Sequence, residues 1–355
     1  MEKPIAITMG DPAGIGPEIV AKAFRDAPEL TRGCFVAGDV SSLRRASQWI
    51  AGRGLVALPV AEIGDGSEAL AMPPRCIPVL QVTTDRGCVA IGAVSAVAGR
   101  MAAESVVWAA DAALRGEIAA LVTAPLNKES LAAAGMPHSQ FPGHTEMLQH
   151  RAALTAAVAV SELPVRMMLA NDELRTVLVS IHVALRKAID AVTPANVLQT
   201  LLITDGALTT LLGRRPRIAV AGLNPHAGEG GLFGTEEIEA IAPAIDAARA
   251  KGLDVSGPIA PDTVFMRARA HGGCSGEFDV VVAMYHDQGL IPVKYLGVDK
   301  GVNVTLGLPL VRTSPDHGTA FDIAGSGRAD PASLLQAIRM ARDLAAMQRR
   351  PAPEG

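Results

Sequence analysis

Apolar residues along the chain fall into short continuous runs that alternate with longer stretches of helical periodicity. The runs at 34–38 and 278–284 are typical of buried strands. The Ala-rich stretch 94–114 and the amphipathic stretch 330–347 are typical of helices. Because strand-like runs alternate with helix-like ones, we expect an α/β fold with a largely parallel sheet.

The same pattern predicts the remaining elements and two irregular segments. Proline at the first helical position and glycine after the last residue mark several of the helix ends. The segments 164–170 and 175–181 are predicted to form a hairpin, Gly64–Pro74 a loop, and 349–355 a disordered tail. Further predicted strands lie at 4–8, 119–125 and 216–223, and further helices at 17–24, 127–135, 195–203 and 235–250.

Composition and charge narrow the class of protein. The 355 residues are enough for about two domains, and 49% of them are hydrophobic. A net charge of −4 argues against nucleic acid as a partner. The start of the chain lacks the apolar core of a signal peptide, and no apolar run reaches the roughly 18 residues of a membrane span. We therefore expect a soluble, cytoplasmic protein with no membrane partner.

The cysteines indicate the same compartment. Cys34, Cys76, Cys88 and Cys274 form no C-x-x-C pair and no disulfide-like spacing. We interpret them as ordinary thiols in a reducing environment.

Three histidines share one setting, because His182, His226 and His286 each follow an apolar strand-like run. One such histidine alone is most simply a polar loop residue. The carboxyl ends of parallel strands meet at one edge of a sheet, so three of them can converge. Imidazoles suit Zn²⁺ and similar ions, and three ligands leave a position for substrate. A metallohydrolase uses such a site as readily as a dehydrogenase does, and these residues alone leave both open.

His226 lies in the turn GLNPHAGEGGLFGTEE at 222–237. Thr235 and the two glutamates after it are predicted to form the cap and first turn of the following helix.

Two further clusters suit an anionic ligand. His144 and Thr145 precede a helical run, where they could bind an anion, or Thr145 could simply cap the helix. Lys294, Asn303 and Arg312 are spaced nine residues apart in apolar surroundings. Cations in such surroundings suit a phosphate or carboxylate ligand, and the alternative is that they are solvated loop charges.

The segment MGDPAGIGPE (9–18) is not a Rossmann turn. Ile19 stands where the third glycine belongs, and Pro17 interrupts the motif. No GK[ST] follows, so it is not a P-loop either. We interpret it as a strand-to-helix turn at the mouth of a cleft.

Taken together, the motifs resemble one known family over about residues 4–347. ITMGDPAGIGPEI, VTAPLNK, GHTE, GLNPHAGEGG, AMYHDQG and KGVNVTLGLPLVRTSPDHGTAFDIAGSG occur in the order found in the 4-hydroxythreonine-4-phosphate dehydrogenase family of vitamin B6 biosynthesis. The stretch SPDHGTAFDIAGSGRADP also resembles the adenosine-binding loop of isocitrate and isopropylmalate dehydrogenases, which bind a nicotinamide cofactor without a GxGxxG turn.

The resemblance implies a fold and a reaction. The fold is two α/β/α domains with a cleft between them, with 1–130 plus 308–355 on the cofactor side and 131–307 carrying the metal ligands and a dimer interface. The reaction is oxidation of a secondary alcohol by NAD or NADP with a divalent metal, Zn or alternatively Co or Mg, and loss of CO₂ from the β-keto product. The family's third metal ligand comes from the other subunit, which implies a homodimer with shared sites.

The resemblance also implies roles for individual residues. His182, His226 and His286 match the metal ligands, and Lys294 and His286 match the catalytic positions. The substrate-binding positions are matched by His144, Thr145, Lys294, Asn303 and Arg312, and the adenosine end of the cofactor, more loosely, by His317, Gly318 and Asp322.

Departures from the vitamin B6 enzymes leave the substrate open. The context SIHVALRKA around His182 and the apolar Leu232 differ from the residues usual there. VTAPLNK is closer to a branch that acts on D-threonate or D-erythronate 4-phosphate. The intact GHTE favours a phosphorylated substrate over the aromatic dihydrodiols of a further branch. A non-catalytic metal- or phosphate-binding protein is the remaining alternative.

Overall fold

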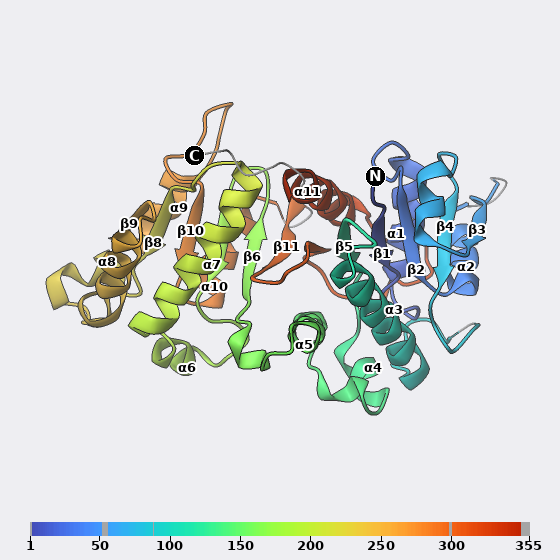
Figure 1. The fold of residues 1–355 in the computed structure, drawn as a ribbon, viewed down its shortest axis with the longest axis horizontal. Coiled ribbons are helices and arrows are strands. Elements are labelled where there is room, and N and C mark those ends of the chain that lie inside the picture. Colours follow the sequence, from blue (N-terminus) through green and yellow to red (C-terminus); the bar gives the residue numbers. More distant parts are fainter. Residues whose placement is uncertain (1, 52–55, 88, 298–299, 349–355) are drawn as a thin grey trace. The chain divides into compact units, whose positions relative to one another are not determined.

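The computed structural model describes residues 2–51, 56–87, 89–297 and 300–348, which contain helices and a mostly parallel set of strands (Figure 1). Contacts divide the chain into two compact units. Unit 1 comprises residues 1–164 and 308–345, and unit 2 comprises residues 165–307 and 346–355. The sequence places its first boundary after residue 130, whereas the contacts group 131–164 with unit 1.

The described residues of unit 1 form six neighbouring strands, and every strand pairing among them is parallel. In spatial order these are β3 (Val60–Ile63), β4 (Ile77–Gln81), β2 (Cys34–Gly38), β1 (Ile5–Thr8), β5 (Ala120–Thr123) and β12 (Arg312–Pro315). Its helices are α1 (Gly16–Asp26), α2 (Val40–Ala51), α3 (Ala96–Leu114), α4 (Lys128–Ala133), α5 (His144–Ala156) and most of α11 (Ala332–Gln348).

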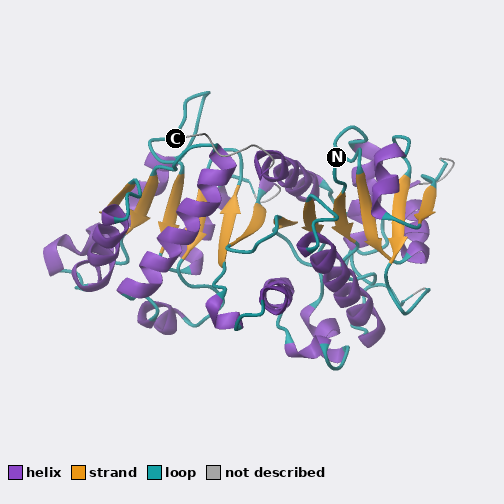
Figure 2. Cartoon of the chain, viewed as in Figure 1, coloured by secondary structure: helices purple, strands orange, loops and turns teal. Residues whose placement is uncertain are grey.

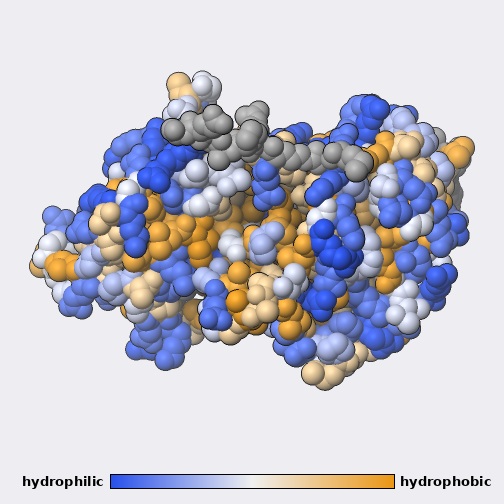
Figure 3. All heavy atoms as spheres, viewed as in Figure 1, coloured by the Kyte–Doolittle hydropathy of each residue, from blue (hydrophilic) through white to orange (hydrophobic). Residues whose placement is uncertain are grey.

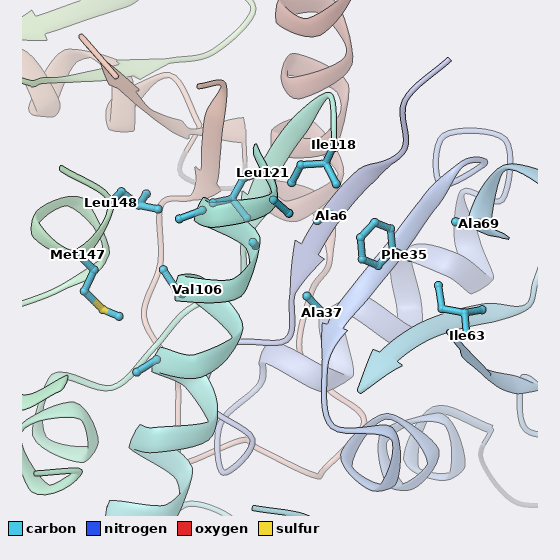
Figure 4. Packing of buried hydrophobic residues seen from close by; sticks show 14 of the residues in the cluster. Ala6, Phe35, Ala37, Ile63, Ala69, Val106, Ile118, Leu121, Met147 and Leu148 are labelled. Carbon is cyan, nitrogen blue, oxygen red and sulfur yellow. The ribbon is translucent and has the colours of Figure 1, made fainter. Parts of the chain in front are cut away.

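The core of unit 1 lies between its strands and α3. Phe35 of β2, Leu121 of β5 and Val106 of α3 are fully buried and belong to one apolar cluster (Figure 4). Alanine fills much of the remaining contact, since the helix presents Ala103, Ala109 and other small residues to the sheet. A chain with few aromatic residues therefore packs its core by close approach of helix and strands.

Six neighbouring strands also lie in the part of unit 2 that the structure describes. In spatial order they are β11 (Val302–Leu306), β6 (Arg166–Ala170), β7 (Arg175–Leu178), β10 (Val280–Ala283), β8 (Ile218–Ala221) and β9 (Val255–Ile259). β6 is antiparallel to β11 and β7, and the pairs from β7 to β9 are parallel. Its helices are α6 (Leu185–Asp190), α7 (Pro194–Leu212), α8 (Ala242–Ala250), α9 (Pro261–Ala268) and α10 (His286–Tyr295). In both units helices lie on both faces of the strands (Figure 2).

The structure confirms the predicted alternation and the predicted hairpin, which is the antiparallel pair β6 and β7. Two predictions need correction. Gly64–Pro74 is not a plain loop, because Gly66–Ala71 forms a 3₁₀ helix capped by Asp65, which accepts a hydrogen bond from the Ser67 N–H at 2.7 Å. The helix predicted at 195–203 extends to Leu212, where Gly213 ends it in the left-handed conformation.

Cys34, Cys76 and Cys274 are free thiols, and Cys88 and the tail 349–355 lie outside the described residues. No helix in the described part of the chain is long and apolar enough to cross a membrane.

Candidate active site

The order of strands in unit 2 brings two of the three predicted histidines together. β7, β10 and β8 are adjacent and parallel, so their carboxyl ends lie at one edge. His182 and His286 follow β7 and β10 there, and their ring centroids are 5.4 Å apart with the planes inclined by 45°. Both rings line a pocket of about 350 Å³, which Tyr285 and Asp287 also line.

His286 is oriented by the residue that follows it. It opens α10, and its Nδ1 is 2.7 Å from the Asp287 carboxylate. A carboxylate on one ring nitrogen fixes the tautomer and leaves the other nitrogen for a ligand. Sequence reasoning missed Asp287, although a carboxylate directly after a candidate metal-binding histidine is a usable signal.

His226 lies apart from this pair. It begins a run of five left-handed residues, 226–230, and its ring packs 6.1 Å from that of Phe233. Among the described residues there is no group of three or more His, Cys, Asp or Glu side chains arranged to hold a metal ion. Within one chain, the structure therefore assembles two of the three predicted ligands.

The loop that carries His226 is held by a buried carboxylate. Glu237, 3% exposed, accepts hydrogen bonds from the N–H groups of Leu223 and Asn224, both at 2.7 Å, and from Asn224 Nδ2 at 2.9 Å. The predicted cap and first turn are confirmed at the backbone, since the helical residues begin at Glu236 and the Thr235 carbonyl oxygen accepts hydrogen bonds from the N–H groups of Ile238 and Glu239 at 2.9 and 2.8 Å. The segment continues as a π-helical turn, Glu237–Ile241.

Two of the histidines have an unfavourable backbone. His182 and His226 adopt φ values of 49° and 53°, in the left-handed region that few residues other than glycine occupy. Such conformations cost free energy and persist where the surrounding structure enforces them, which is often at functional sites. The strain marks the same two loops that the sequence pattern marks.

This donor set fits a divalent ion of the zinc type. Two imidazoles share one pocket, and one of them is oriented through its second nitrogen. Imidazole nitrogen is a good ligand for Zn²⁺ and Co²⁺, and a site with two ligands from one chain has room for further ligands.

Unit 1 contains a buried cation. Arg312, on β12, is 4% exposed and donates its Nε and Nη2 to Thr123 Oγ1 at 3.2 and 2.8 Å. Burial lowers the pKa of Arg312 to about 10, and the nearby Glu146 carboxylate opposes that shift. Arg312 is therefore not a solvated loop charge. Sequence reasoning did not identify Thr123 as its partner, because the contact spans 189 residues.

His144 lies beside this arginine. Burial and the charge of Arg312 hold the pKa of His144 well below its usual range, while a hydrogen bond to the backbone of Ala124 opposes them. Its Nε2 is buried and has no hydrogen-bond partner among the described residues. A neutral imidazole with a shielded, unsatisfied nitrogen is suited to a ligand.

Thr145 is not the cap of α5. The N-cap is Gly143, with no side-chain cap, and Thr145 is the second residue of the helix. The alternative of a threonine-capped helix is therefore wrong, and Thr145 follows His144 in the first turn of α5.

Lys294 and Asn303 lie in unit 2, Lys294 in the last turn of α10 and Asn303 on β11. Both are partly buried. Eight residues of helix separate Lys294 from His286, which is about 12 Å along the axis. Lys294 is therefore on the helix that His286 opens but not at the histidine pair.

The predicted cofactor residues lie in the irregular segment between β12 and α11. His317 Nδ1 is 3.0 Å from the Gly318 carbonyl oxygen, and its Nε2 is buried with no partner among the described residues. Gly318 and Asp322 are exposed. The segment thus offers one unsatisfied imidazole nitrogen and accessible polar groups, which fits a polar ligand such as an adenosine.

Comparison with known proteins identifies one family and several similar dehydrogenases. The family model described as "Pyridoxal phosphate biosynthetic protein PdxA" matches residues 31–341. A 4-hydroxythreonine-4-phosphate dehydrogenase of Beijerinckia indica is 51% identical over 97% of this chain and 96% of its own length. A D-threonate 4-phosphate dehydrogenase of Pectobacterium atrosepticum is 44% identical over 97% and 100%.

A solved structure agrees. The crystal structure of 4-hydroxythreonine-4-phosphate dehydrogenase from Klebsiella pneumoniae has a TM-score of 0.83 and 41% identity, covering 97% of this chain and 100% of that one. The agreement of sequence, fold and motifs makes this chain an oxidoreductase of the dehydrogenase type, and it belongs to the pyridoxal phosphate biosynthetic protein PdxA family.

Proposed function

We propose that the protein oxidises the secondary alcohol of 4-phosphohydroxy-L-threonine with NAD⁺ or NADP⁺, and that the resulting β-keto acid loses CO₂. The reaction transfers one hydride to the nicotinamide and releases one proton. The relatives described above are named as dehydrogenases of phosphorylated hydroxy acids. The side chains of the candidate site in this chain suit such a substrate.

The observation that carries the proposal is the buried arginine. A guanidinium that is 4% exposed is costly to bury, and a dianionic phosphate compensates it better than a neutral ligand does. The neutral imidazole of His144 stands beside it with an unsatisfied Nε2. We assign Arg312, His144 and Thr145 to the phosphate or its neighbouring hydroxyl group.

Lys294 and Asn303 are assigned to the remaining polar groups of the substrate. Both are partly buried on regular elements of unit 2, so their backbone positions are fixed. A lysine ammonium can hold the substrate carboxylate or move a proton during oxidation and decarboxylation.

We further propose a divalent ion held by His182, His226 and His286, one of them from a second subunit. The resemblance implies that the third ligand, His286, comes from that subunit; because His182 and His286 lie 5.4 Å apart within one chain, we propose His226 instead. Such an ion lowers the pKa of a bound hydroxyl group and stabilises developing negative charge. Exposed apolar residues beside both histidine loops favour an interface with a second subunit. They are Val183 (53% exposed) and Leu185 (59%) beside His182, and Leu232 (72%) and Phe233 (47%) beyond His226.

Apolar surface is also visible over the part of unit 2 that carries α7 (Figure 3). Contiguous apolar surface of this kind is typical of a buried subunit interface. A homodimer would cover these residues and supply His226.

The second candidate substrate is D-threonate 4-phosphate or D-erythronate 4-phosphate. It is favoured by the identity with a D-threonate 4-phosphate dehydrogenase, 44% over the whole of that protein, and by the VTAPLNK segment. The chemistry and the metal site would be the same. The substrates differ in whether an amino group or a hydroxyl group lies next to the carboxylate.

The test is reduction of NAD⁺ and of NADP⁺, followed by absorbance, with each of the three phosphorylated acids and added Zn²⁺, Co²⁺ or Mg²⁺. We expect turnover of 4-phosphohydroxy-L-threonine that a chelator abolishes. Turnover of a sugar acid alone would replace the first substrate with the second. An enzyme that binds neither dinucleotide would overturn the proposed cofactor.

A further inference from the structure

Two buried charged side chains near the start of α1 have no role in the proposed reaction. Glu18, the last residue of the segment MGDPAGIGPE, is fully buried, and Lys22 is 7% exposed. They lie one helical turn apart, with Lys22 Nζ 3.2 Å from Glu18 Oε1. Both side chains also contact a segment about 300 residues later in the chain.

The pair binds the backbone of that segment in an alternating pattern. Glu18 accepts hydrogen bonds from the N–H of Ala329 at 2.8 Å and from the N–H of Gly327 at 3.3 Å. Lys22 donates to the carbonyl oxygens of Gly327 at 2.8 Å and of Ala329 at 2.5 Å. Gly327 and Ala329 thus each have both the N–H and the C=O group hydrogen-bonded. Alternate residues of a strand are paired in the same way by a neighbouring strand.

The same segment is also fixed at its other end. The Ile15 N–H donates to the Thr319 carbonyl oxygen at 3.0 Å. Gly14 packs so closely there that an added Cβ would lie 2.8 Å from the Thr319 Cβ. The segment 9–18, which lacks the glycine pattern of a nucleotide-binding turn, therefore packs against residues 319–329 and holds them in place.

Stability alone does not account for the pair. Replacing a buried ion pair by well-packed apolar side chains is often neutral or stabilising. Apolar side chains could not hold two N–H and two C=O groups of an irregular segment, and that is what this pair adds.

We propose that Glu18 and Lys22 are positioning residues that hold the segment 317–329 in the conformation that binds the nicotinamide dinucleotide. This inference rests on the proposed function, in which His317, Gly318 and Asp322 contact the adenosine end. A segment without regular structure loses conformational entropy when it binds a ligand, and ordering it beforehand raises affinity. Residues 316–331 contain no helix or strand, and apart from local turn bonds at 320–328 the contacts from residues 14–22 are what order the segment.

The test uses the double variant Glu18→Gln/Lys22→Met in the full-length enzyme, which leaves no lone buried charge. The matched control is Arg115→Met/Glu117→Gln, an ion pair in the same unit whose side chains are 55% and 52% exposed. Three quantities are measured for each protein. They are the affinity for NAD⁺ and NADP⁺ by calorimetry, the rate of amide exchange at Gly327 and Ala329 without dinucleotide, and the KM values for the dinucleotide and for the phosphorylated acid.

We expect the double variant to bind dinucleotide roughly tenfold or more weakly, with its KM for the phosphorylated acid changed less than about twofold. Exchange at Gly327 and Ala329 should accelerate, and the control should match wild type in every measurement. If the double variant does not fold, the single variant Glu18→Gln, which loses one hydrogen-bond acceptor, replaces it. We expect this variant also to bind dinucleotide more weakly and to exchange faster at Gly327 and Ala329.

Two outcomes separate this inference from the proposed function. A wild-type enzyme that binds neither dinucleotide overturns the cofactor assignment and, with it, this inference. A wild-type enzyme that binds dinucleotide while the variant binds it equally well, despite faster exchange at Gly327 and Ala329, overturns the positioning role and leaves the proposed function intact.

Discussion

The two edges of the strand trio β7, β10 and β8 carry opposite kinds of chemistry. At the carboxyl edge, His182 and His226 lie on exposed loops with left-handed backbones, and His286 opens α10. At the amino edge the same strands are bordered by Arg175, Asp279 and Arg217; Arg217 binds the Asp279 carboxylate, and Arg175 donates to the Asp279 carbonyl oxygen. One edge leaves polar groups available to ligands at a cost in backbone strain, and the other uses a carboxylate to bind arginine side chains of the same chain.

The amino edge is organised around one carboxylate. Asp279, whose side chain is 9% exposed, accepts hydrogen bonds from the Arg217 N–H and from Arg214 Nη1, both at 2.8 Å. Burial alone would raise the pKa of Asp279, but the hydrogen bonds from the two arginines hold it well below its usual range. We infer that this edge contributes to stability and that the carboxyl edge contributes to function.

The largest expected effect is on the carboxyl edge. His286→Ala should lower kcat/KM by roughly 10³-fold, because a metal ligand supports several kcal/mol of transition-state stabilisation. The melting temperature in the presence of chelator should stay close to that of wild type, since the His286 side chain is 37% exposed. Steady-state kinetics and calorimetric melting measure the two quantities.

The matched control is His271→Ala, which removes an exposed histidine in the turn after α9, outside the histidine pair. It should leave both activity and melting temperature near wild type. A loss of activity below tenfold for His286→Ala would contradict a catalytic role for this edge.

The second expected effect concerns the amino edge, where a substitution should lower stability and leave activity unchanged. Asp279→Asn should lower the free energy of unfolding by about 1–3 kcal/mol, because Arg214 and Arg217 lose a charged and largely buried hydrogen-bond acceptor. Activity per folded molecule should not change. Denaturant unfolding measures the loss, and Asp246→Asn, whose ion pair with Arg249 is 75% exposed at the carboxylate, should change it by no more than about 0.5 kcal/mol.

A pH series sharpens this contrast. Because the pKa of Asp279 is lower in the folded state than its ordinary value of about 3.9, its contribution is fully present above that pH and is lost as the pH falls below it. Wild type and Asp279→Asn should therefore approach each other in unfolding free energy as the pH falls below about 4. A constant difference down to pH 2 would show that the carboxylate charge is not the source of the stability.

The carboxyl edge was largely predictable from sequence because its signals are local. Apolar periodicity locates β7, β8 and β10, and a histidine after each strand is visible without any alignment. The amino edge was not predicted, because the pairing of Asp279 with Arg217 spans 62 residues and depends on which strands are neighbours. The partner of Arg312 was likewise not predicted, since its contact with Thr123 spans 189 residues.

The position of His226 shows a different limit. Its strand and loop were predicted, and strand order alone would place it next to His286 as readily as His182. The run of left-handed residues from 226 to 230 instead takes its ring to Phe233. Glycines permit that path, but the sequence shows only that the turn is permissive.

This divergence leads to the last prediction, which tests whether the carboxyl edge is complete within one chain. If His182 and His286 of one subunit work with His226 of a second, a heterodimer of His226→Ala and His286→Ala subunits has one intact site and one site lacking two ligands. Co-expression with two affinity tags and sequential purification isolates that species. It should recover about half of the wild-type activity, whereas each homodimeric variant stays inactive, because a twofold axis creates two equivalent sites. An inactive but well-formed heterodimer would mean that all three ligands must come from the same chain, and hence that the loop 222–237 rearranges to bring His226 to the pair.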